Sequence, residues 1–501
     1  MRADWPVPNT MTLDPREARE LARTQGPRGC GWQPLRDSPL SLVEQLIAHV
    51  VELITNQGLG PGMRLPSVRV MAEATGLSRC TVVQAYGRLE AQGLVGSRRG
   101  AGFFVCTQPV QAPCRSGDAC DVAGPLAFDR AFLLRSMFSG PWRGAASAGA
   151  GLLPAHWLDA DMLGAAIRSV GRTAGTSLLS YGTPHGYRPL RQQIATQLQS
   201  QEVPAHPDLH LMTVAGVTQG LNLVVRSLLQ PGDTVLVEDP GWFLVHGLLQ
   251  AQGLQVVGVP RRHDGPDLAG LAQLAEQHRP RMFIINTAVH NPTGSTLSLG
   301  VAHEVLRIAE RFDFLLAEDD TFADFHPGTP VRLAALDRLQ RVLLIGGYAK
   351  TLGGGLRVGY IAGHEALMRR LVDAKLLGSP TSPELGEQVV HRILADGQYR
   401  RHVDRLRERV NQARGRCLSQ LEALGCRVAH PPHAGMFVWA DCGRDSETLA
   451  REAVALGLLL APGMLFSPQC APSRMVRVPV PMADDPQAWS LFAQALDRVA
   501  P

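Results

Sequence analysis

Lys350 is the residue of this sequence best placed for covalent chemistry. Lys350 and Lys375 are the two lysines among 49 Lys and Arg residues, and all the others are arginines. Arginine is therefore the residue used wherever a positive charge suffices. A lysine amine can lose its proton and attack a carbonyl to form an imine, whereas a guanidinium stays charged. An apolar run from Val342 leads to Lys350, and a glycine-rich turn and Arg357 follow it. This setting predicts a Schiff-base lysine beside a phosphate-binding arginine. The alternative is that both lysines are surface residues, and composition alone does not decide between the two.

The elements that must position this lysine begin near residue 151. From there helical and β-rich segments alternate, which predicts an α/β fold, a mostly parallel sheet with helices on both faces, over 151–385. A long arginine-rich helical stretch and further β segments over 386–501 predict a smaller α+β domain. Strands are expected at 211–215, 234–238, 255–259, 281–286, 314–318, 342–346 and 358–362, and near 426–429, 436–440 and 475–479.

A separate module precedes this body. Apolar residues at helical spacing predict a helix within 42–54, and shorter helices are expected at 66–75 and 79–92. Two β segments around a basic glycine turn follow at 94–105. Three small helices and a hairpin predict a winged helix-turn-helix over 38–106. The preceding residues, 1–37, are expected to form a loose arm, and 107–150, rich in Ala, Gly, Pro and Ser, a linker.

The polar side chains of the winged module suit a DNA duplex. Residues at the start of its third helix would meet base edges, and Arg79 can make two hydrogen bonds to a guanine. Arginines near the second helix and on the basic turn would meet phosphates, which carry the salt-dependent part of affinity. The alternative is a small helical dimerisation module with solvated arginines. The candidate DNA-binding residues are Arg64, Ser67, Arg69, Ser78, Arg79, Thr81, Gln84, Arg98, Arg99 and Gly100.

Composition limits the class of protein further. The 501 residues are enough for about three domains, and a net charge of +4 is too small to identify a nucleic-acid partner. The sequence shows no signal-peptide pattern and no apolar run of membrane-spanning length, so a cytoplasmic location is expected. Nine scattered cysteines without a Cys-x-x-Cys pair predict free thiols and no metal site, with a Cys114–Cys120 disulfide as the open alternative.

Two resemblances sharpen these expectations. The segment 38–105 resembles, over its whole length, the winged-helix domain of GntR-type bacterial repressors, which implies a duplex DNA operator as partner. Residues from about 150 to the end resemble fold-type I, pyridoxal-phosphate-dependent aminotransferases. The resemblance is centred on Lys350 and extends along the chain on both sides of it. The two together resemble the layout of MocR/GabR-type transcriptional regulators and cover nearly everything except the arm and the linker.

The aminotransferase resemblance implies pyridoxal 5′-phosphate as cofactor and a role for each matching motif. Lys350 would carry the cofactor, and Asp319, in Glu-Asp-Asp at a strand end, would pair with the pyridinium nitrogen. Asn291, in His-Asn-Pro-Thr-Gly, would bind the ring 3′-oxygen, and Trp242 would stack on the ring. Each motif is weak alone, but their order and separations around a nearly unique lysine make coincidence improbable.

Further residues are assigned to the phosphate and to the ligand. Gly216, Val217 and Thr218 follow a strand and open a helix, where N–H groups and a hydroxyl can bind phosphate, and Arg357 joins them. Tyr181 matches a tyrosine that reaches the phosphate of the neighbouring subunit, which implies a homodimer. The remaining assignment is Arg477, which matches the arginine that binds a ligand carboxylate.

Two departures weaken the expectation of an ordinary enzyme. Relatives carry Tyr where this chain has Thr321, and Ser where it has Gly347, so a phenol and a phosphate-binding hydroxyl are missing. We therefore expect a transcription factor that senses a small amine, an amino acid or vitamin B6 with little or no turnover, and that is nucleoid-associated when bound to DNA. The alternatives are a working aminotransferase with a fused DNA-binding domain, and a GntR-type repressor whose large domain only dimerises and holds no cofactor.

Overall fold

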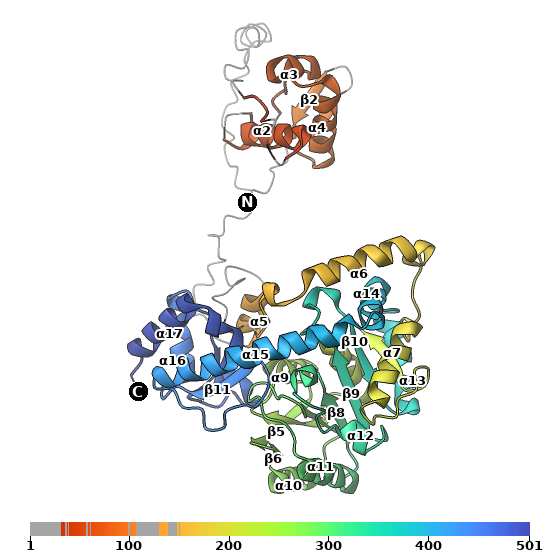
Figure 1. Cartoon of the computed structure of the whole chain (residues 1–501), viewed down its shortest axis with the longest axis vertical. Helices are drawn as coiled ribbons and strands as arrows, with labels where there is room; N and C mark the ends of the chain where they lie inside the picture. The colour runs from red at the N-terminus through yellow and green to blue at the C-terminus, as the bar shows by residue number, and fades with distance from the viewer. Residues whose placement is uncertain are drawn as a thin grey trace, which may run out of the picture. The chain divides into compact units, whose positions relative to one another are not determined.

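The computed structural model describes residues 32–35, 38, 40–56, 59–60, 62–98, 101–106, 130–138, 148–149 and 151–500. The chain divides into two compact units, Met1–Gly124 and Pro125–Pro501 (Figure 1). Among the described residues, no helix is both long and apolar enough to cross a membrane. Arg99, Gly100, Cys114 and Cys120, for which roles were predicted, lie outside the described residues.

The first unit has the predicted winged helix-turn-helix. Its elements are α2 (Leu42–Asn56), α3 (Val68–Thr75), α4 (Arg79–Ala91), β1 (Val95–Arg98) and β2 (Gly102–Val105), with the two strands antiparallel. Ser67 and Ser78 cap α3 and α4 through their hydroxyls, as their short polar side chains favour. Gly76 ends α3 in the left-handed conformation that glycine adopts without strain.

A small core fixes α4 in this unit. Leu46 and Val50 of α2 pack against Val82 and Leu89 of α4, all four with no exposed surface. Tyr86 is buried in the same core, and its hydroxyl donates to the carbonyl oxygen of Pro66 at 2.9 Å. Because α4 buries one side in this way, its polar side is left to the surface.

The second unit is built on an eight-stranded sheet of order β3-β10-β9-β8-β7-β4-β5-β6. The run β9, β8, β7, β4, β5 is parallel, whereas β10 is antiparallel to both of its neighbours and β6 is antiparallel to β5. This confirms the prediction of a mostly parallel sheet. The strands are β3 (Leu211–Val214), β4 (Thr234–Asp239), β5 (Gln255–Arg262), β6 (Gly265–Pro266), β7 (Met282–Ile285), β8 (Leu315–Asp319), β9 (Val342–Gly347) and β10 (Gly359–Ala362).

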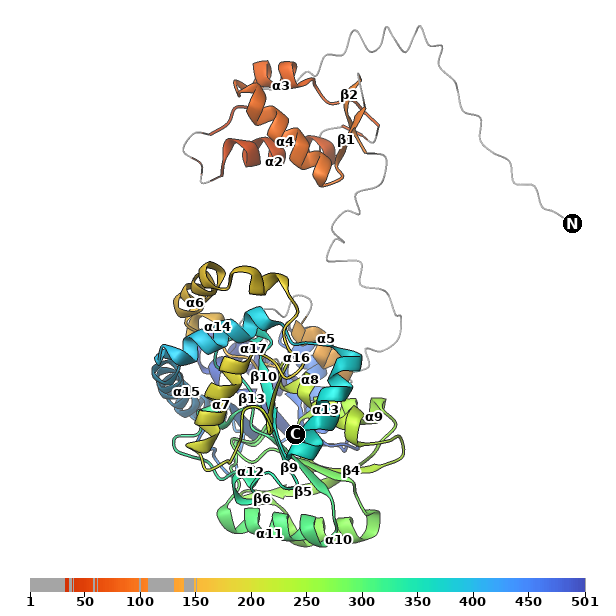
Figure 2. The same cartoon turned by 90° about the vertical axis from the view of Figure 1, so that its right-hand side faces the viewer.

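Helices cover both faces of this sheet. One face packs against α8, α9 and α13, and Figure 2 shows α13 beside α8. The other face packs against α6, α7, α10, α11 and α14. Burial on both sides explains why these strands read as apolar runs in the sequence. The helices are α6 (Ala160–Thr173), α7 (Arg188–Gln199), α8 (Val217–Leu228), α9 (Phe243–Ala251), α10 (Leu268–His278), α11 (Leu299–Arg311), α12 (Leu333–Leu336), α13 (Glu365–Gly378) and α14 (Glu384–Ala395).

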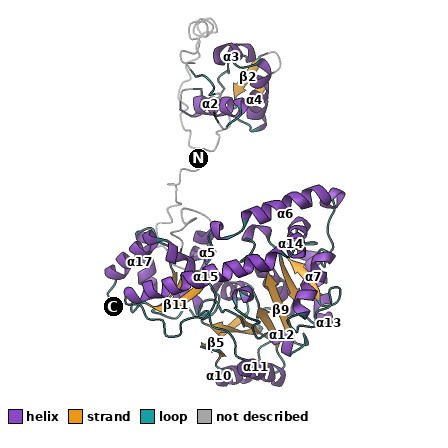
Figure 3. Cartoon of the chain, in the orientation of Figure 1, coloured by secondary structure: helices purple, strands orange, loops and turns teal. Residues whose placement is uncertain are grey.

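The C-terminal part forms a smaller α+β body around a second core (Figure 3). Its sheet has the order β11-β13-β12, all antiparallel. The elements are α15 (Gln398–Ala423), β11 (Phe437–Asp441), α16 (Ser446–Ala455), β12 (Ala461–Pro462), β13 (Met475–Pro479) and α17 (Pro486–Arg498), with α5 (Arg130–Phe138) packed on the same core.

One predicted strand of this body is wrong. The segment 426–429 forms no strand, and its β pairing is limited to a bridge between Arg427 and Asp441. Pro431 and Pro432 follow closely and have no N–H to donate to a ladder, so pairing cannot extend along the chain.

Candidate functional site

The candidate site lies at the carboxyl ends of the parallel strands. Asp319 is the last residue of β8, Asn286 directly follows β7, and Lys350 comes three residues after β9. Neighbouring parallel strands end at the same edge of a sheet, which is where ligands bind in open α/β folds. The topology therefore brings together polar side chains that are far apart in the sequence.

Lys350 lies at this edge, and the pKa of its amine is unusually low for a lysine. Its Nζ donates to the carbonyl oxygen of Gly151 at 3.2 Å and lies 5.5 Å from the ring centroid of Phe322. Desolvation lowers the pKa of Lys350 to about 8, and the positive charge of Arg477 adds to this, while Asp319 acts in the opposite direction. An amine with this pKa is neutral far more often at pH 7 to 8 than an ordinary lysine, as a nucleophile requires.

Asp319 is the acidic group of the site. Burial raises its pKa to about 6, although hydrogen bonds from Thr321 oppose the shift. Its Oδ1 accepts from the Thr321 backbone N–H at 3.0 Å and from the Thr321 hydroxyl at 2.5 Å. A buried carboxylate of this kind is stabilised by a cationic partner, and a protonated ring nitrogen would supply one.

Arg477 and Asn291 face each other across the site. Arg477 donates to Asn291 Oδ1 at 3.2 Å and to the carbonyl oxygen of Gly149 at 2.6 Å. It is 2% exposed, and the rings of Phe437 and Phe466 lie 4.5 and 5.2 Å from its guanidinium. Burial lowers the pKa of Arg477 to about 9. Its buried Nε has no hydrogen-bond partner within the described part of the chain, so the group has donor capacity left for a ligand.

The predicted phosphate-binding residues also meet. Arg357 donates to the carbonyl oxygen of Ala215 at 2.8 Å, and a Cβ at Gly216 would lie 2.8 Å from the same guanidinium. Gly216 has a φ of 88° and precedes the first turn of α8, with Val217 and Thr218 in that turn. The cradle thus consists of the N-terminus of a helix, an exposed arginine and a glycine whose missing side chain keeps it open.

Gly347 adjoins this cradle at the end of β9. A Cβ there would lie 3.1 Å from the carbonyl oxygen of Val358 and 3.2 Å from Val217 Cγ2. A serine would crowd the backbone in this arrangement, so the glycine suits the contact between β9 and α8.

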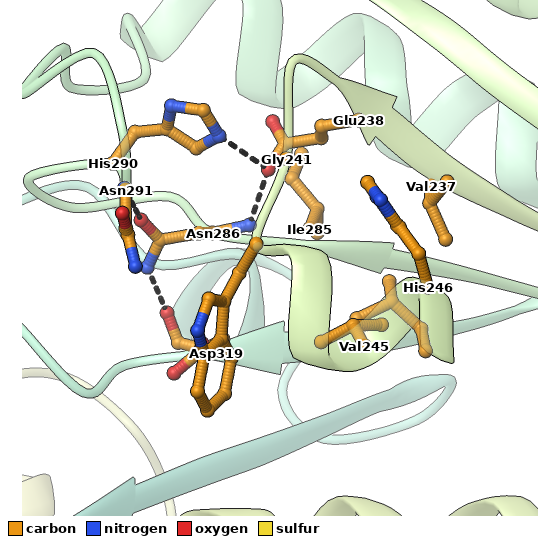
Figure 4. A pocket seen from close by; sticks show the side chains of 12 residues that line it. Val237, Glu238, Gly241, Val245, His246, Ile285, Asn286, His290, Asn291 and Asp319 are labelled. Atoms are coloured by element: carbon orange, nitrogen blue, oxygen red, sulfur yellow. Dashed lines mark hydrogen bonds and ion pairs between the residues drawn. The ribbon is translucent and has the colours of Figure 1, made fainter. Parts of the chain in front are cut away.

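A small cavity is lined by Trp242 and Asp319, among other residues. Figure 4 shows Asp319, Asn286 and Glu238 in its wall. Asn286 organises its wall: its Nδ2 donates to the Asp319 carbonyl oxygen at 2.6 Å, and its Oδ1 accepts from the Asn291 N–H at 3.2 Å. Its own N–H donates to Glu238 Oε2 at 2.8 Å. Sequence reasoning missed Asn286 as a site residue, although its place at the end of a parallel strand was a usable signal.

His246 is a second residue of this cavity that sequence reasoning missed. Its ring is buried, with the backbone of Glu238 as a polar neighbour. Burial first, and the charge of Arg130 second, lower the pKa of His246 to about 3, so the ring is neutral. Nothing in the local sequence distinguishes it from a core histidine.

The alternative that both lysines are surface residues is wrong for Lys375. It is 1% exposed, and its Nζ donates to the carbonyl oxygens of Pro184 and Thr213 and to Ser382 Oγ, at 2.8 to 2.9 Å. All three of its donors are used, so it has no free donor. It anchors the loop that carries Tyr181, whose own side chain is 90% exposed.

The predicted DNA-binding residues of the first unit divide by what they already contact. Ser78 Oγ lies 2.8 Å from Thr81 Oγ1, so these two hydroxyls are hydrogen-bonded to each other at the N-terminus of α4. Arg69 pairs with Glu73 at 3.0 Å, and the Arg98 guanidinium lies 4.6 Å from the ring centroid of Phe104.

Three further candidates complete this surface. A Cβ at Gly102 would lie 3.3 Å from Arg64 Nε, which places Arg64 beside the hairpin. Arg79 and Gln84 are exposed on α4. Arginines and polar side chains are therefore present on both the helix and the hairpin, the two parts with which a winged helix meets a duplex.

Two protein-family models match the chain. The model for aminotransferase class I and II matches residues 149–486, and the model for bacterial regulatory proteins of the gntR family matches residues 42–105. One match falls within each of the two units described above.

Similar proteins include both regulators and enzymes. The HTH-type transcriptional regulator YisV of Bacillus subtilis is 26% identical over 87% of this chain and 91% of that protein. The probable rhizopine catabolism regulatory protein MocR of Rhizobium meliloti is 28% identical over 65% of this chain and 66% of that protein. The 2-aminoadipate transaminase of Thermus thermophilus is 30% identical over 59% of this chain and 75% of that protein.

A solved structure agrees with the fold of the second unit. The α-aminoadipate aminotransferase LysN of Thermus thermophilus, complexed with N-(5′-phosphopyridoxyl)-L-leucine, has a TM-score of 0.66 and 25% identity. The match covers 73% of this chain and 94% of LysN.

Proposed function

Because the chain belongs to the aminotransferase class I and II family and carries a gntR-family winged helix-turn-helix ahead of it, we propose that it is a DNA-binding transcriptional regulator that binds pyridoxal 5′-phosphate on Lys350 and senses an amino compound or the cofactor itself. The observation that carries the proposal is the amine of Lys350, with a pKa of about 8, between Asp319 and Arg477 on a chain that also has a DNA-binding head.

The residues present fit the cofactor. Pyridoxal phosphate supplies an electrophilic aldehyde and an electron-withdrawing pyridinium ring. Lys350 would hold the aldehyde end, Asp319 would keep the proton on the ring nitrogen, and Asn291 would donate to the ring oxygen. The open cradle at Gly216 and Arg357 suits the phosphate.

Further supports come from the unused capacity of the site. Trp242 lines the same cavity as Asp319 and offers a ring to stack against the pyridine. Arg477 has a buried donor without a partner among the described residues, which suits the carboxylate of an amino-acid effector.

We expect this site to sense rather than to turn over. Thr321 has no phenol, and its hydroxyl is committed to Asp319, so Thr321 offers no hydrogen bond to a ring oxygen. Proton transfer at the substrate carbon demands tight geometry, and a misplacement of about 1 Å can cost roughly a hundredfold in rate. The alternative function, a working aminotransferase, is favoured by the intact set Lys350, Asp319 and Arg477 and by the similarity to the Thermus transaminase.

A homodimer is part of the proposal. Leu179, Tyr181 and Leu377 are 86%, 90% and 93% exposed, and burying such large apolar side chains between two copies of the chain would favour association. In a dimer, Tyr181 of one subunit would reach the cofactor phosphate of the other. Two DNA-binding heads would then respond to one shared body, which requires the ligand to bind two states of the dimer with different affinity. Such a factor acts in the bacterial cytoplasm, on nucleoid DNA.

The test compares DNA binding with and without the cofactor. Fluorescence anisotropy on DNA fragments from beside the gene would measure the affinity of the full chain, first alone, then with pyridoxal phosphate, then with amino acids added. We expect the cofactor or an amino compound to change the affinity at least fivefold, and Lys350→Ala to lose that change while still binding DNA. Equal affinity in all states would contradict sensing. Half-transamination at about 1–10 s⁻¹, an ordinary enzyme rate, would favour the enzyme instead.

A further inference from the structure

A second cavity lies apart from the cofactor site, between the end of α7, the segment 327–330 and the first turns of α15. We propose that it binds a small hydroxylated carboxylate, separately from any ligand held at Lys350. Its volume of about 460 Å³ falls within the range of small-molecule pockets, roughly 300–1,000 Å³. Binding of this carboxylate in the second cavity does not depend on the regulatory role proposed above.

The inner end of this cavity is a small polar chamber. It is lined by Asp320, Asp324, Arg332, Tyr348 and Tyr360, among other residues. The chamber shares Asp324 and Arg332 with the larger cavity and therefore adjoins it. Its volume of about 20 Å³ has room for one water-sized group, such as a single carboxylate oxygen.

Two buried donors at the inner end lack a partner. Arg332 is 5% exposed and binds Asp320 through Nε and Nη2, at 3.0 and 3.1 Å. Its remaining nitrogen, Nη1, and the hydroxyl of Tyr348, which is 3% exposed, make no hydrogen bond within the described part of the chain. Buried donors are normally satisfied because desolvation without a hydrogen bond is costly. Their place at the end of a cavity indicates an acceptor that enters from outside.

A carboxylate oxygen suits these donors best. A guanidinium makes its strongest hydrogen bonds with an ionised acceptor. The charge of Asp320 is already matched by Arg332, and burial raises the pKa of Asp324, which also accepts from the phenol of Tyr399. The negative groups of the chamber are therefore occupied, and a cation would find no free partner there.

The outer walls favour a polar body on the ligand. Gln197, Ser200 and Gln201, around the end of α7, offer amides and a hydroxyl, and Thr329 lies on the opposite loop. At the mouth, Arg407 pairs with Asp404 at 2.8 Å, so neither adds a strong free charge. These groups hydrogen-bond with hydroxyls, so a hydroxy acid of a few carbons fits better than a fatty acid.

The cavity is connected to the cofactor site by direct contacts. The Tyr399 hydroxyl in its wall lies 2.8 Å from Thr351 Oγ1, and Thr351 directly follows Lys350. Asp320 directly follows Asp319. Beyond the cavity, α15 packs against β11 of the smaller body, so an occupant touches elements of both bodies of this unit. A ligand here would thus influence the position of Lys350 relative to the smaller body.

Titration calorimetry of the full chain with glycolate, lactate and glycerate, against glycerol and 1,2-propanediol at equal ionic strength, tests the proposal. We expect binding of at least one carboxylate and of neither neutral alcohol. Tyr348→Phe removes a hydroxyl that has no protein partner, and it should weaken binding about tenfold, the loss of one hydrogen bond to a charged acceptor. Ser200→Trp, at an exposed helix end, should close the mouth and abolish binding.

Arg477→Ala distinguishes this cavity from the cofactor site, because it removes the carboxylate partner there and should leave this binding intact. Thermal melting of each variant would establish that it is folded. Two results would overturn the proposal: no heat of binding with any of the three acids, which would leave water alone in the chamber, or binding that is lost in Arg477→Ala and unchanged in both other variants.

Discussion

Thr321 donates twice to the same carboxylate oxygen of Asp319, through its backbone N–H at 3.0 Å and its hydroxyl at 2.5 Å. Sequence comparison alone presents Thr321 as a missing phenol. In the structure it is a positioning residue, because it fixes the carboxylate that faces the cofactor site and opposes the rise of its pKa.

This relationship predicts a pH dependence of cofactor affinity. Burial raises the pKa of Asp319 to about 6, so below that pH the carboxyl becomes neutral and loses its attraction for a protonated ring nitrogen. Protonation of Lys350, whose pKa is about 8, lowers the affinity for pyridoxal phosphate as the pH drops through 8, and protonation of Asp319 should add a further fall through pH 6. Thr321→Val keeps the N–H and removes the hydroxyl, so this further fall should begin at higher pH. Absorbance titrations from pH 5 to 8 measure this, with Thr173→Val as the control, and identical profiles for wild type and Thr321→Val would contradict the role of the hydroxyl.

Removal of the Lys350 amine should abolish covalent cofactor binding. Lys350→Ala should lose the visible absorption of the bound cofactor and the label fixed by borohydride. Lys350→Arg, which keeps the charge but cannot attack an aldehyde, should lose them as well. Lys375 cannot take over because its three donors are bound in a buried site. A normal absorption band in Lys350→Ala would refute the assignment.

Lys375 should matter for stability instead. Burial lowers the pKa of Lys375 to about 8, below the ordinary lysine value of 10.5. Between these values the unfolded chain binds more protons than the folded one, so this lysine makes stability rise with pH over that window. Lys375→Met should lower the free energy of unfolding. It should also reduce the slope of that free energy against pH by the equivalent of up to one proton. Urea melts from pH 7.5 to 10.5 test this, and a slope unchanged from wild type would contradict it.

In the winged unit, different residues should control discrimination between DNA sequences and affinity for DNA in general. Arg79→Ala should cost about 1–3 kcal/mol of discrimination between operator and control DNA, because a guanine contact is lost. Arg98→Ala should weaken binding to all sequences and reduce the salt slope by about one. Anisotropy at several salt concentrations distinguishes the two, with Arg88→Ala at the other end of α4 as control. If a fragment of residues 107–501 bound DNA as tightly as the full chain, the assignment would fail.

Arg477 should decide the response to ligands with a carboxylate. Arg477→Ala removes the donor to Asn291 and the buried Nε that has no partner among the described residues. The spectral response to amino acids should weaken at least tenfold, whereas the response to simple alkylamines should change little. Titration of cofactor-loaded protein with both ligand classes measures this. An unaltered response to amino acids would place the carboxylate elsewhere.

The sequence by itself determined the two modules and most of their elements. Apolar spacing predicted the first helix, capping and terminating residues predicted the next two, and apolar runs of strand length predicted the parallel strands. The near absence of lysine singled out Lys350 without any coordinates. These signals are local, since helix caps, periodicity and residue type depend on near neighbours in the chain.

Tertiary structure decided what these residues do together. Lys375 looked like a surface residue because its three acceptors come from segments far away in the sequence. Asn286 had no visible partner until the sheet placed it beside Asp319. Likewise, the free donors of Arg332 and Tyr348 become visible only where the ends of β8, β9 and α7 line one chamber, because a cavity is a property of packing and has no signature along the chain.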